Sequence, residues 1–319
     1  MDEFEQGSGL RFAVDMITLY DRELWDVPSF YDFFDPEVID PSVFWDKALD
    51  LVAETGIDGV RLTFGPSHWR NALKRYGTAE RFAEALDARG LELAAGFSTL
   101  LSRGNWESVS QQEGILEETK QYADFLAAAG CSIMVVGLPP RATWHSEDRV
   151  LVDLDYAQRL ADLLHRMGYE TLRRGVKMAL HPKTHGVFWL RRDIDLFMLL
   201  TDPVYVYFCP DTAHISLGEG DPVAIVRDHG SRIIISDWKD ALEPVSAHDE
   251  IDENHLTDLH THYARIGLGR VDWAGLAKAY RDIRYRGWVV LELDAARDPR
   301  QLILSAREFV EHSVLPIYR

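Results

Sequence analysis

The sequence has few cysteines and no long apolar run. Its two cysteines, Cys131 and Cys209, lie in apolar segments and show no C-x-x-C spacing. Such cysteines are typical of a buried core rather than of a disulfide or a reactive thiolate pair. The longest apolar run, LAAAGCSIMVVGL, contains two glycines, and no charged leader followed by an apolar core opens the chain. We therefore expect a cytoplasmic protein with no membrane contact.

Basic side chains are in the minority, with 34 lysines and arginines against 52 acidic residues. The formal net charge of -18 repels nucleic-acid phosphates over most of the surface, so we expect no nucleic-acid partner. Apolar residues make up 46% of the 319 residues, which is enough for a large buried core. Linkers and internal repeats are absent from the sequence. We expect one domain over residues 1–319, and a homo-oligomer is compatible with this composition.

Short runs rich in valine, isoleucine and leucine alternate with longer amphipathic segments. This alternation predicts parallel strands joined by crossover helices. Helices are expected over residues 45–56, 78–90, 156–175 and 273–287. Eight units of this kind favour an α/β fold of the (β/α)8 TIM-barrel type over a doubly wound open sheet. The expected strands cover residues 10–17, 57–64, 91–98, 131–138, 176–182, 204–210, 232–238 and 288–294.

Two stretches are longer than ordinary loops, residues 18–41 and 241–266. In a barrel both would follow strands, at the face where active sites are built. The first is rich in aromatics, and we expect that it either covers the apolar face of a sugar ring or packs into its own core. Its aromatic candidates are Trp25, Phe30, Tyr31 and Phe33.

Polar residues stand where the last four predicted strands end. Residues two apart on a strand share a face, so each strand end can direct its polar side chains to one barrel mouth. These residues are His181 and Lys183, then Asp211, then Asp237 and Lys239, and finally Glu292 and Asp294.

Carboxylates gathered at one mouth would repel one another without a cation. A divalent metal removes this difficulty, and an oxygen-rich set with one imidazole favours manganese or cobalt, with magnesium and zinc as alternatives. The alternative is structural: Asp237 and Asp294 could form ion pairs with Lys239 and Arg297 at the barrel rim.

Several motifs of the second half resemble one known family. PDTAH with GEGDP behind it, then SDWKD, GLGRVDW and YRGWVVLELD, are similar to the xylose-isomerase-like barrels of sugar isomerases and epimerases. The closest likeness is to inosose dehydratases. The resemblance runs in order from about Val176 to Pro299, while the first half matches only in its rhythm of strands and helices.

The resemblance implies metal ligation by Asp211, Asp237 and Glu292, with His214 beside the metal in a catalytic or supporting contact. Many relatives supply glutamate, aspartate, histidine and glutamate in chain order. Here His181 falls where the first glutamate would stand and Asp237 where the histidine would, so the charge of the set is unchanged. His185 lies four residues further on and is the alternative strand-5 ligand.

A histidine-rich segment, HLTDLHTHYARIGLGR, is a candidate for a second metal site. His255, His260 and His262 could form a second site, although an H-x-H in a polar loop is more often exposed to solvent. GLGRVDW is no dinucleotide fingerprint, because it lacks the third glycine and follows no strand of its own. The resemblance makes it a turn before a helix.

A metal at the barrel mouth predicts proton abstraction beside the carbonyl of a small sugar or cyclitol. We therefore expect a sugar or keto-polyol isomerase or epimerase, with a lyase of the inosose dehydratase type as the alternative. The candidate catalytic residues are His214, Lys183 and Lys239, and His214 is preferred because its ordinary pKa lies near neutrality. A nuclease of the endonuclease IV type would need more histidines and a basic groove. A non-catalytic carbohydrate-binding or partner subunit is the remaining reading.

Overall fold

The computed structural model describes residues 9–35, 37–103, 106–141, 149–249, 251–294 and 297–319. Eight parallel strands form one sheet in the order β6-β5-β4-β3-β2-β1-β10-β7. Isolated bridges pair Phe208 with Ile233 and Asp211 with Asp237, which joins β6 to β7 and closes the sheet. The TIM barrel and all eight predicted strands are confirmed. They are β1 (Leu10–Asp15), β2 (Gly59–Leu62), β3 (Glu92–Ser98), β4 (Ile133–Gly137), β5 (Lys177–His181), β6 (Val206–Phe208), β7 (Ile235–Trp238) and β10 (Gly287–Leu291).

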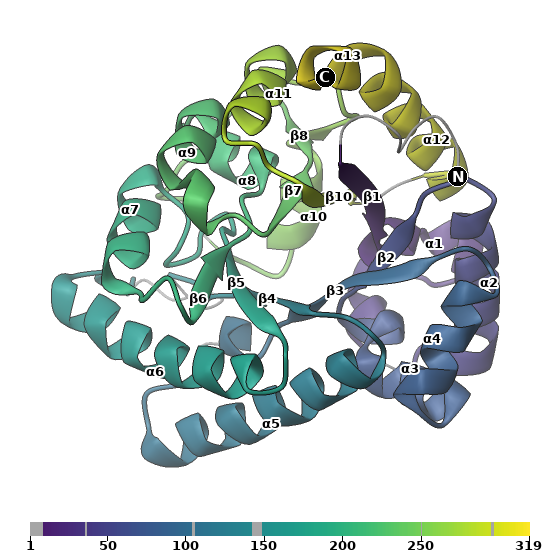
Figure 1. Cartoon of the computed structure of the whole chain (residues 1–319), viewed down its shortest axis with the longest axis horizontal. Coiled ribbons are helices and arrows are strands. Elements are labelled where there is room, and N and C mark those ends of the chain that lie inside the picture. The colour runs from purple at the N-terminus through teal and green to yellow at the C-terminus, as the bar shows by residue number, and fades with distance from the viewer. Residues whose placement is uncertain (1–8, 36, 104–105, 142–148, 250, 295–296) are drawn as a thin grey trace.

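Helices surround the strands as an outer ring (Figure 1). The four helices expected from the sequence are present as α2, α4, α6 and α11, and none of the described helices is long and apolar enough to cross a membrane. The helices longer than six residues are α2 (Pro41–Ala53), α3 (Trp69–Tyr76), α4 (Ala79–Asp87), α5 (Val109–Ala128), α6 (Leu154–Leu172), α7 (Arg191–Leu200), α9 (Pro222–His229), α11 (Trp273–Asp282) and α12 (Pro299–Phe309). The shorter ones are α1 (Arg22–Trp25), α8 (Thr212–Leu217), α10 (His255–His260) and α13 (Leu315–Tyr318).

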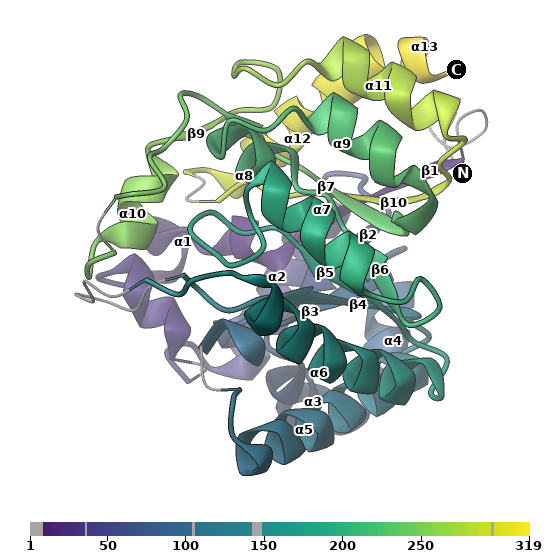
Figure 2. The same ribbon diagram turned by 90° about the vertical axis from the view of Figure 1, so that its left-hand side faces the viewer.

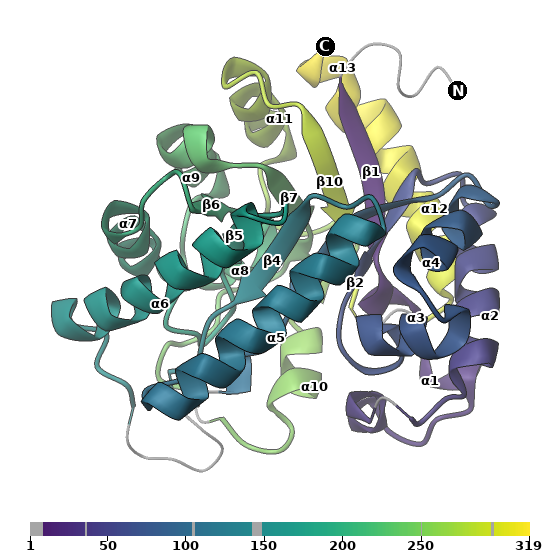
Figure 3. The same ribbon diagram turned by 60° about the horizontal axis from the view of Figure 1, so that its bottom comes forward.

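The two long stretches meet at one end of the barrel. Residues 18–41 contain α1 and the 3-10 helix η2 (Phe30–Phe34), and residues 241–266 contain α10 and the short strand β9 (Tyr263–Ala264). The rings of Phe30 and His260 lie edge to face, with their centroids 4.6 Å apart. Figures 2 and 3 show α10 and the segment around α1 at the same end of the molecule. The expected placement of both loops at the mouth is confirmed.

The barrel interior is apolar in one layer and polar in the next. A cluster of small apolar residues fills the interior, including Ala13, Val135, Ala179, Cys209, Ile235 and Val290. Because side chains alternate across a strand, the residue two positions further along points to the same side. That step leads to Asp15, Gly137, His181, Asp211, Asp237 and Glu292. The fold therefore places a layer of mostly polar residues next to the apolar layer, on the side of the barrel mouth.

The turn that contains GLGRVDW is organised by one buried carboxylate. Asp240 belongs to β8 (Asp240–Ala241), which pairs with β9, and its side chain is fully buried. Its two oxygens accept hydrogen bonds from the backbone N–H groups of Ala241, Gly267, Gly269 and Val271 and from the indole of Trp273. A β-carbon at Gly269 would lie 2.3 Å from this carboxylate. The motif is a turn that leads into α11, as expected, and Gly269 leaves room for the Asp240 carboxylate.

We predict that Asp240→Asn lowers the free energy of unfolding by at least about 3 kcal/mol, because an amide nitrogen would face donors that need an acceptor. Urea denaturation at neutral pH measures this loss. The matched control is Asp155→Asn on α6, where the side chain is 81% exposed and pairs with Arg159. Its effect should stay within about 0.5 kcal/mol. An Asp240→Asn protein that unfolds at the same urea midpoint as the parent would contradict the stabilising role of the Asp240 carboxylate.

Candidate metal centre at the barrel mouth

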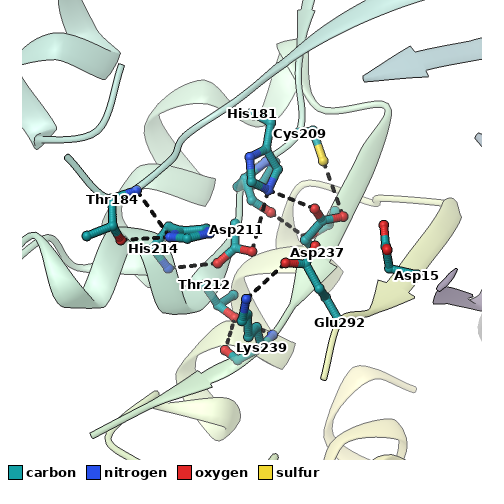
Figure 4. Close-up of polar contacts among 12 residues, drawn as sticks. Asp15, His181, Thr184, Cys209, Asp211, Thr212, His214, Asp237, Lys239 and Glu292 are labelled. Atoms are coloured by element: carbon teal, nitrogen blue, oxygen red, sulfur yellow. Dashed lines mark hydrogen bonds and ion pairs between the residues drawn. The ribbon is translucent and has the colours of Figure 1, made fainter. Parts of the chain in front are cut away.

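The polar layer brings together the four residues expected to bind a metal. His181 ends β5, Asp211 follows β6, Asp237 lies in β7, and Glu292 follows β10. One ligand atom from each lies within 4.8 Å of the others, and all four residues are buried. In Figure 4 the His181 ring and the carboxylates of Asp211 and Asp237 point toward one another. Another set, His181, Asp211 and His214, meets the same distance limit.

His181 and Asp211 carry ligand atoms that lack hydrogen bonds. His181 Nε2 lies 2.9 Å from Asp237 Oδ2 and 3.5 Å from Asp211 Oδ2. Neither contact has hydrogen-bond geometry, and both His181 Nε2 and Asp211 Oδ2 are buried without a hydrogen-bond partner. Buried polar atoms are almost always satisfied, so ion-pair contacts that lack hydrogen-bond geometry fit a cation shared by these atoms. One imidazole with three carboxylates is a donor set that could hold a divalent metal.

His181, rather than His185, lies in this cluster. The Nε2 atom of His185 contacts the carbonyl oxygen of Ser246 at 2.9 Å, and its ring lies 4.9 Å from that of His255. Burial acts against a charge on His181, but the nearby carboxylates of Asp211 and Asp237 outweigh it and raise the pKa to about 9. The ring therefore carries a proton in the absence of any other cation.

Arg61 of β2 is a member of the site that the sequence analysis missed. Its side chain is 1% exposed, and its guanidinium contacts three carboxylates. These contacts are to Asp15 Oδ2 at 2.5 Å, to both oxygens of Asp237 at 2.6 Å, and to Glu292 Oε2 at 2.5 Å. Two of the four candidate ligands are therefore already held by a fixed cation.

The missed residues carry a signal that the strand pattern could have revealed. Arg61 is the third residue of the fully buried strand GVRL, and Asp15 is the last residue of LRFAVD. Charged side chains are almost never fully buried unless they are paired. Applying the same period-two argument to the first two strands would have placed both residues in the mouth layer. Burial raises the pKa of the Asp15 carboxyl to about 7, with Arg61 acting in the opposite direction.

Lys239 supplies the second fixed cation. Its Nζ lies 2.9 Å from Glu292 Oε1 and 2.5 Å from Asp294 Oδ2, and it lies 3.7 Å from the centre of the Tyr263 ring. Burial opposes its charge, but Asp294 and Glu292 raise its pKa well above the ordinary value. The structural alternative thus holds in part: Lys239 pairs with Asp294, whereas Asp237 pairs with Arg61, and Arg297 is exposed.

Negative charge exceeds positive charge at the mouth, as expected where a divalent cation binds. Five carboxylates, those of Asp15, Asp211, Asp237, Glu292 and Asp294, share the mouth with three cations, Arg61, Lys239 and a His181 that is protonated when no metal is bound. Burying this excess negative charge is costly unless protons or a metal neutralise it. The residues present therefore fit a divalent ion. Because Arg61 already contacts oxygens of Asp237 and Glu292, fewer of these oxygens are available to the ion.

His214 is oriented by Thr184. The Thr184 backbone N–H donates to His214 Nδ1 at 3.2 Å, and the Thr184 hydroxyl lies 2.7 Å from the same atom. Because the backbone N–H can only donate, Nδ1 is an acceptor and a neutral His214 carries its proton on Nε2. Burial, with Lys239 nearby, lowers its pKa well below the ordinary value. The near-neutral titration that favoured His214 as a base therefore does not apply in the folded protein.

Lys183 differs from Lys239 in lacking an ionic partner. Within the described part of the chain its side-chain amine forms no hydrogen bond or ion pair, and Lys183 lines the cavity at the mouth. Burial lowers its pKa, partly opposed by Asp294. Lys183 is therefore the amine at this mouth that is free to contact a bound molecule.

A cavity of about 860 Å³ opens above the polar layer. Of the four aromatic candidates in residues 18–41, only Phe30 lines it. Phe33 is fully buried against Tyr20, Trp25 packs on Phe44, and Tyr31 stacks on Phe34. The interpretation as loop core is therefore correct for most of them, and Phe34, which the sequence analysis did not name, lines the cavity beside Phe30.

The histidine-rich segment forms no second metal cluster in the described residues. His255 and His260 line the cavity, whereas His262 lies outside it with Nδ1 3.3 Å from the Glu243 carbonyl oxygen. Burial lowers the pKa of His255 to about 4. Both groups with metal-like spacing lie at the strand ends.

A family model described as xylose isomerase-like TIM barrel matches residues 49–312. An inosose dehydratase from Geobacillus kaustophilus is 26% identical over 245 residues, covering 72% of this chain and 77% of the relative. An inosose dehydratase from Erwinia tasmaniensis is 28% identical over 242 residues, covering 70% of this chain and 78% of the relative. The resemblance read from the motifs is confirmed, and so is the expectation of an enzyme.

Solved structures agree on the fold. L-ribulose 3-epimerase has a TM-score of 0.70 at 14% identity and covers 97% of this chain and 95% of its own. The IOLI protein, whose crystal structure includes a bound zinc atom, has a TM-score of 0.69 at 14% identity and covers 97% of this chain and 98% of its own. At such low identity these two structures support the barrel alone.

Proposed function

The chain belongs to the xylose isomerase-like TIM barrel family, and we propose that it is a divalent-metal-dependent enzyme that removes a proton beside the carbonyl of a keto-sugar or keto-cyclitol. The observation that carries this proposal is the convergence of His181 Nε2 and Asp211 Oδ2, both buried without hydrogen bonds. The zinc bound by the IOLI protein is a precedent for a metal on a barrel of this fold. The ligands would be His181, Asp211, Asp237 and Glu292.

The residues around this set have distinct proposed roles. When bound, a divalent ion would supply Lewis-acid polarisation of the substrate carbonyl. Lys183, the amine without a carboxylate partner, would accept or return the proton. His214 would donate its Nε2–H to a substrate oxygen, because Thr184 holds Nδ1 as an acceptor. Lys239, fixed between Glu292 and Asp294, would position Glu292 rather than take part in proton transfer.

The fate of the deprotonated substrate separates three reaction classes. Return of the proton to the neighbouring carbon gives an isomerase, and return to the opposite face gives an epimerase. Loss of the hydroxyl one carbon further on, as water, leaves a carbon–carbon double bond conjugated to the carbonyl and makes the enzyme a lyase. Because relatives of this chain are named inosose dehydratase, we favour the lyase over the isomerase and the epimerase, which the sequence alone had favoured.

The metal proposal is tested by reconstitution. Protein purified without chelator, stripped and reloaded with manganese, cobalt or zinc, should hold about one equivalent of metal per chain by elemental analysis. Manganese or cobalt should support the highest turnover. Less than about a tenth of an equivalent with every metal would rule out the ligand set.

We predict that His214→Gln keeps its metal but loses about a hundredfold or more in turnover, the usual contribution of a positioned proton donor or acceptor. Glutamine retains a polar side chain of similar reach and removes the imidazole. Metal content and turnover are measured on the same preparation. Thr184→Val is the companion variant: it keeps the backbone N–H to Nδ1, so its loss should be smaller. A His214→Gln enzyme with the turnover of the parent would exclude His214 from proton transfer and leave Lys183 as the candidate.

A further inference from the structure

The cavity is large for a single sugar or cyclitol ring. Its volume of about 860 Å³ lies near the upper end of the range of roughly 300–1,000 Å³ that holds drug-sized ligands. Charged groups of the barrel layer line its floor, among them Asp15, Arg61, His181 and Glu292. A ring bound at this floor would leave the outer part of the cavity unfilled.

One wall of the outer part is apolar, while polar residues, among them His68, Asn71, His255 and His260, line other parts of the cavity. Phe34 and Phe64 stack with centroids 4.7 Å apart and ring planes 13° apart, which gives the wall a flat aromatic surface. Phe30 meets Phe34 edge to face at 6.3 Å. From the segment around α10, Ile251 and Leu256 line the same cavity. A second polyol ring placed against Phe34 and Phe64 would turn hydroxyls toward side chains that cannot form hydrogen bonds.

Phe34 is the exposed member of this wall. It keeps 46% of its surface accessible, whereas Phe30 keeps 7%. Exposed aromatic surface inside a concave site is the feature expected where a ligand completes the packing. The basic residues at the rim do not change this chemistry, because Arg70 and Lys74 are paired with Glu118 and Glu37.

From these features we infer that the cavity contains an aromatic subsite, formed by Phe30, Phe34 and Phe64, and that the substrate is a keto-polyol bearing an aromatic substituent. The inference rests on the proposed function for the polyol end and extends it by naming the group attached to that end. The polyol occupies the polar floor, and its aromatic ring packs against the exposed part of Phe34. A bare cyclitol would use the floor alone.

The test compares phenyl β-D-glucoside with methyl β-D-glucoside by isothermal titration against the metal-loaded protein. The two probes share the polyol and differ only in the substituent. The phenyl compound should bind about tenfold more tightly or better, since it buries additional aromatic surface against Phe34. Equal affinities, or no binding of the phenyl compound at millimolar concentration, would overturn the subsite.

Variants at Phe34 test whether the preference for the phenyl glucoside arises at this side chain. Phe34→Ala should bring the two affinities within about threefold of each other and leave methyl glucoside unchanged, while Phe34→Leu should retain part of the preference through area alone. The control is Leu199→Ala on α7, where an 81% exposed side chain lies outside the cavity. An unchanged phenyl preference in Phe34→Ala would contradict the assignment.

The two proposals can fail separately. The subsite residues are not metal ligands, so the phenyl preference is also measured on metal-free protein. A chain that takes up no metal but still prefers the phenyl compound would refute the metal enzyme and leave the subsite standing. A chain that binds one metal and treats both glucosides alike would refute the subsite alone.

Discussion

Asp211→Asn is expected to lose more than about a hundredfold in metal affinity, and nearly all turnover with it. Loss of an outer partner of a metal ligand usually costs 10- to 100-fold, so loss of a direct ligand should exceed that. The fold should survive, because Asp211 also caps α8 through the His214 backbone N–H, and asparagine caps equally well. Metal titration and turnover measure the change. Glu292→Gln should behave in the same way.

His262→Ala is the matched control for these variants. His262 belongs to the histidine-rich segment but lies outside the cavity, and its contact is with the Glu243 carbonyl oxygen. Metal affinity and turnover should stay within a few fold of the parent. If His262→Ala lost its metal while Asp211→Asn kept it, the metal site would lie in the histidine-rich segment instead.

Arg61→Met should lower the free energy of unfolding of the metal-free protein by about 3–5 kcal/mol, the usual cost of breaking a buried ion pair by removing one partner. Methionine fills similar volume but leaves Asp15, Asp237 and Glu292 without their shared cation. Urea denaturation in the presence of a chelator measures the loss. Manganese should then recover more stability in this variant than in the parent, because a metal would replace the missing charge.

Two controls separate burial from charge. Arg61→Lys keeps the charge but cannot bridge three carboxylates, so its loss should be intermediate. Arg159→Met removes an arginine that is 48% exposed and paired with Glu107 and Asp155, and should cost at most about 1 kcal/mol. An Arg61→Met protein as stable as the parent in chelator would show that the carboxylates need no fixed cation.

The barrel was predictable because each strand is a short apolar run with its own helix behind it. The same pattern placed His181, Asp211, Asp237 and Glu292, since period two determines which strand-end residues face the mouth. Applied only to the last four strands, it missed Asp15 and Arg61. Nothing in the local sequence pairs Arg61 with Asp237, because that contact forms only when β2 and β7 meet across the closed barrel.

The roles of individual side chains were less predictable. His214 follows Asp211 by three residues, but its tautomer depends on Thr184, which is 30 residues earlier in the chain. Likewise, an aromatic-rich loop does not reveal which ring faces a cavity. Phe33 is buried and Phe34 is 46% exposed although the two are adjacent, because η2 turns one ring into the core and the other toward Phe64.

Solvent exchange tests the central claim most directly. Manganese-loaded protein is incubated in deuterated water with a panel of ketoses and keto-inositols, including derivatives that carry an aromatic group. Deuterium should enter a carbon beside the carbonyl in at least one substrate, and Asp211→Asn should abolish this exchange. A fully metal-loaded protein that exchanges no deuterium into any member of the panel would contradict proton abstraction at this site.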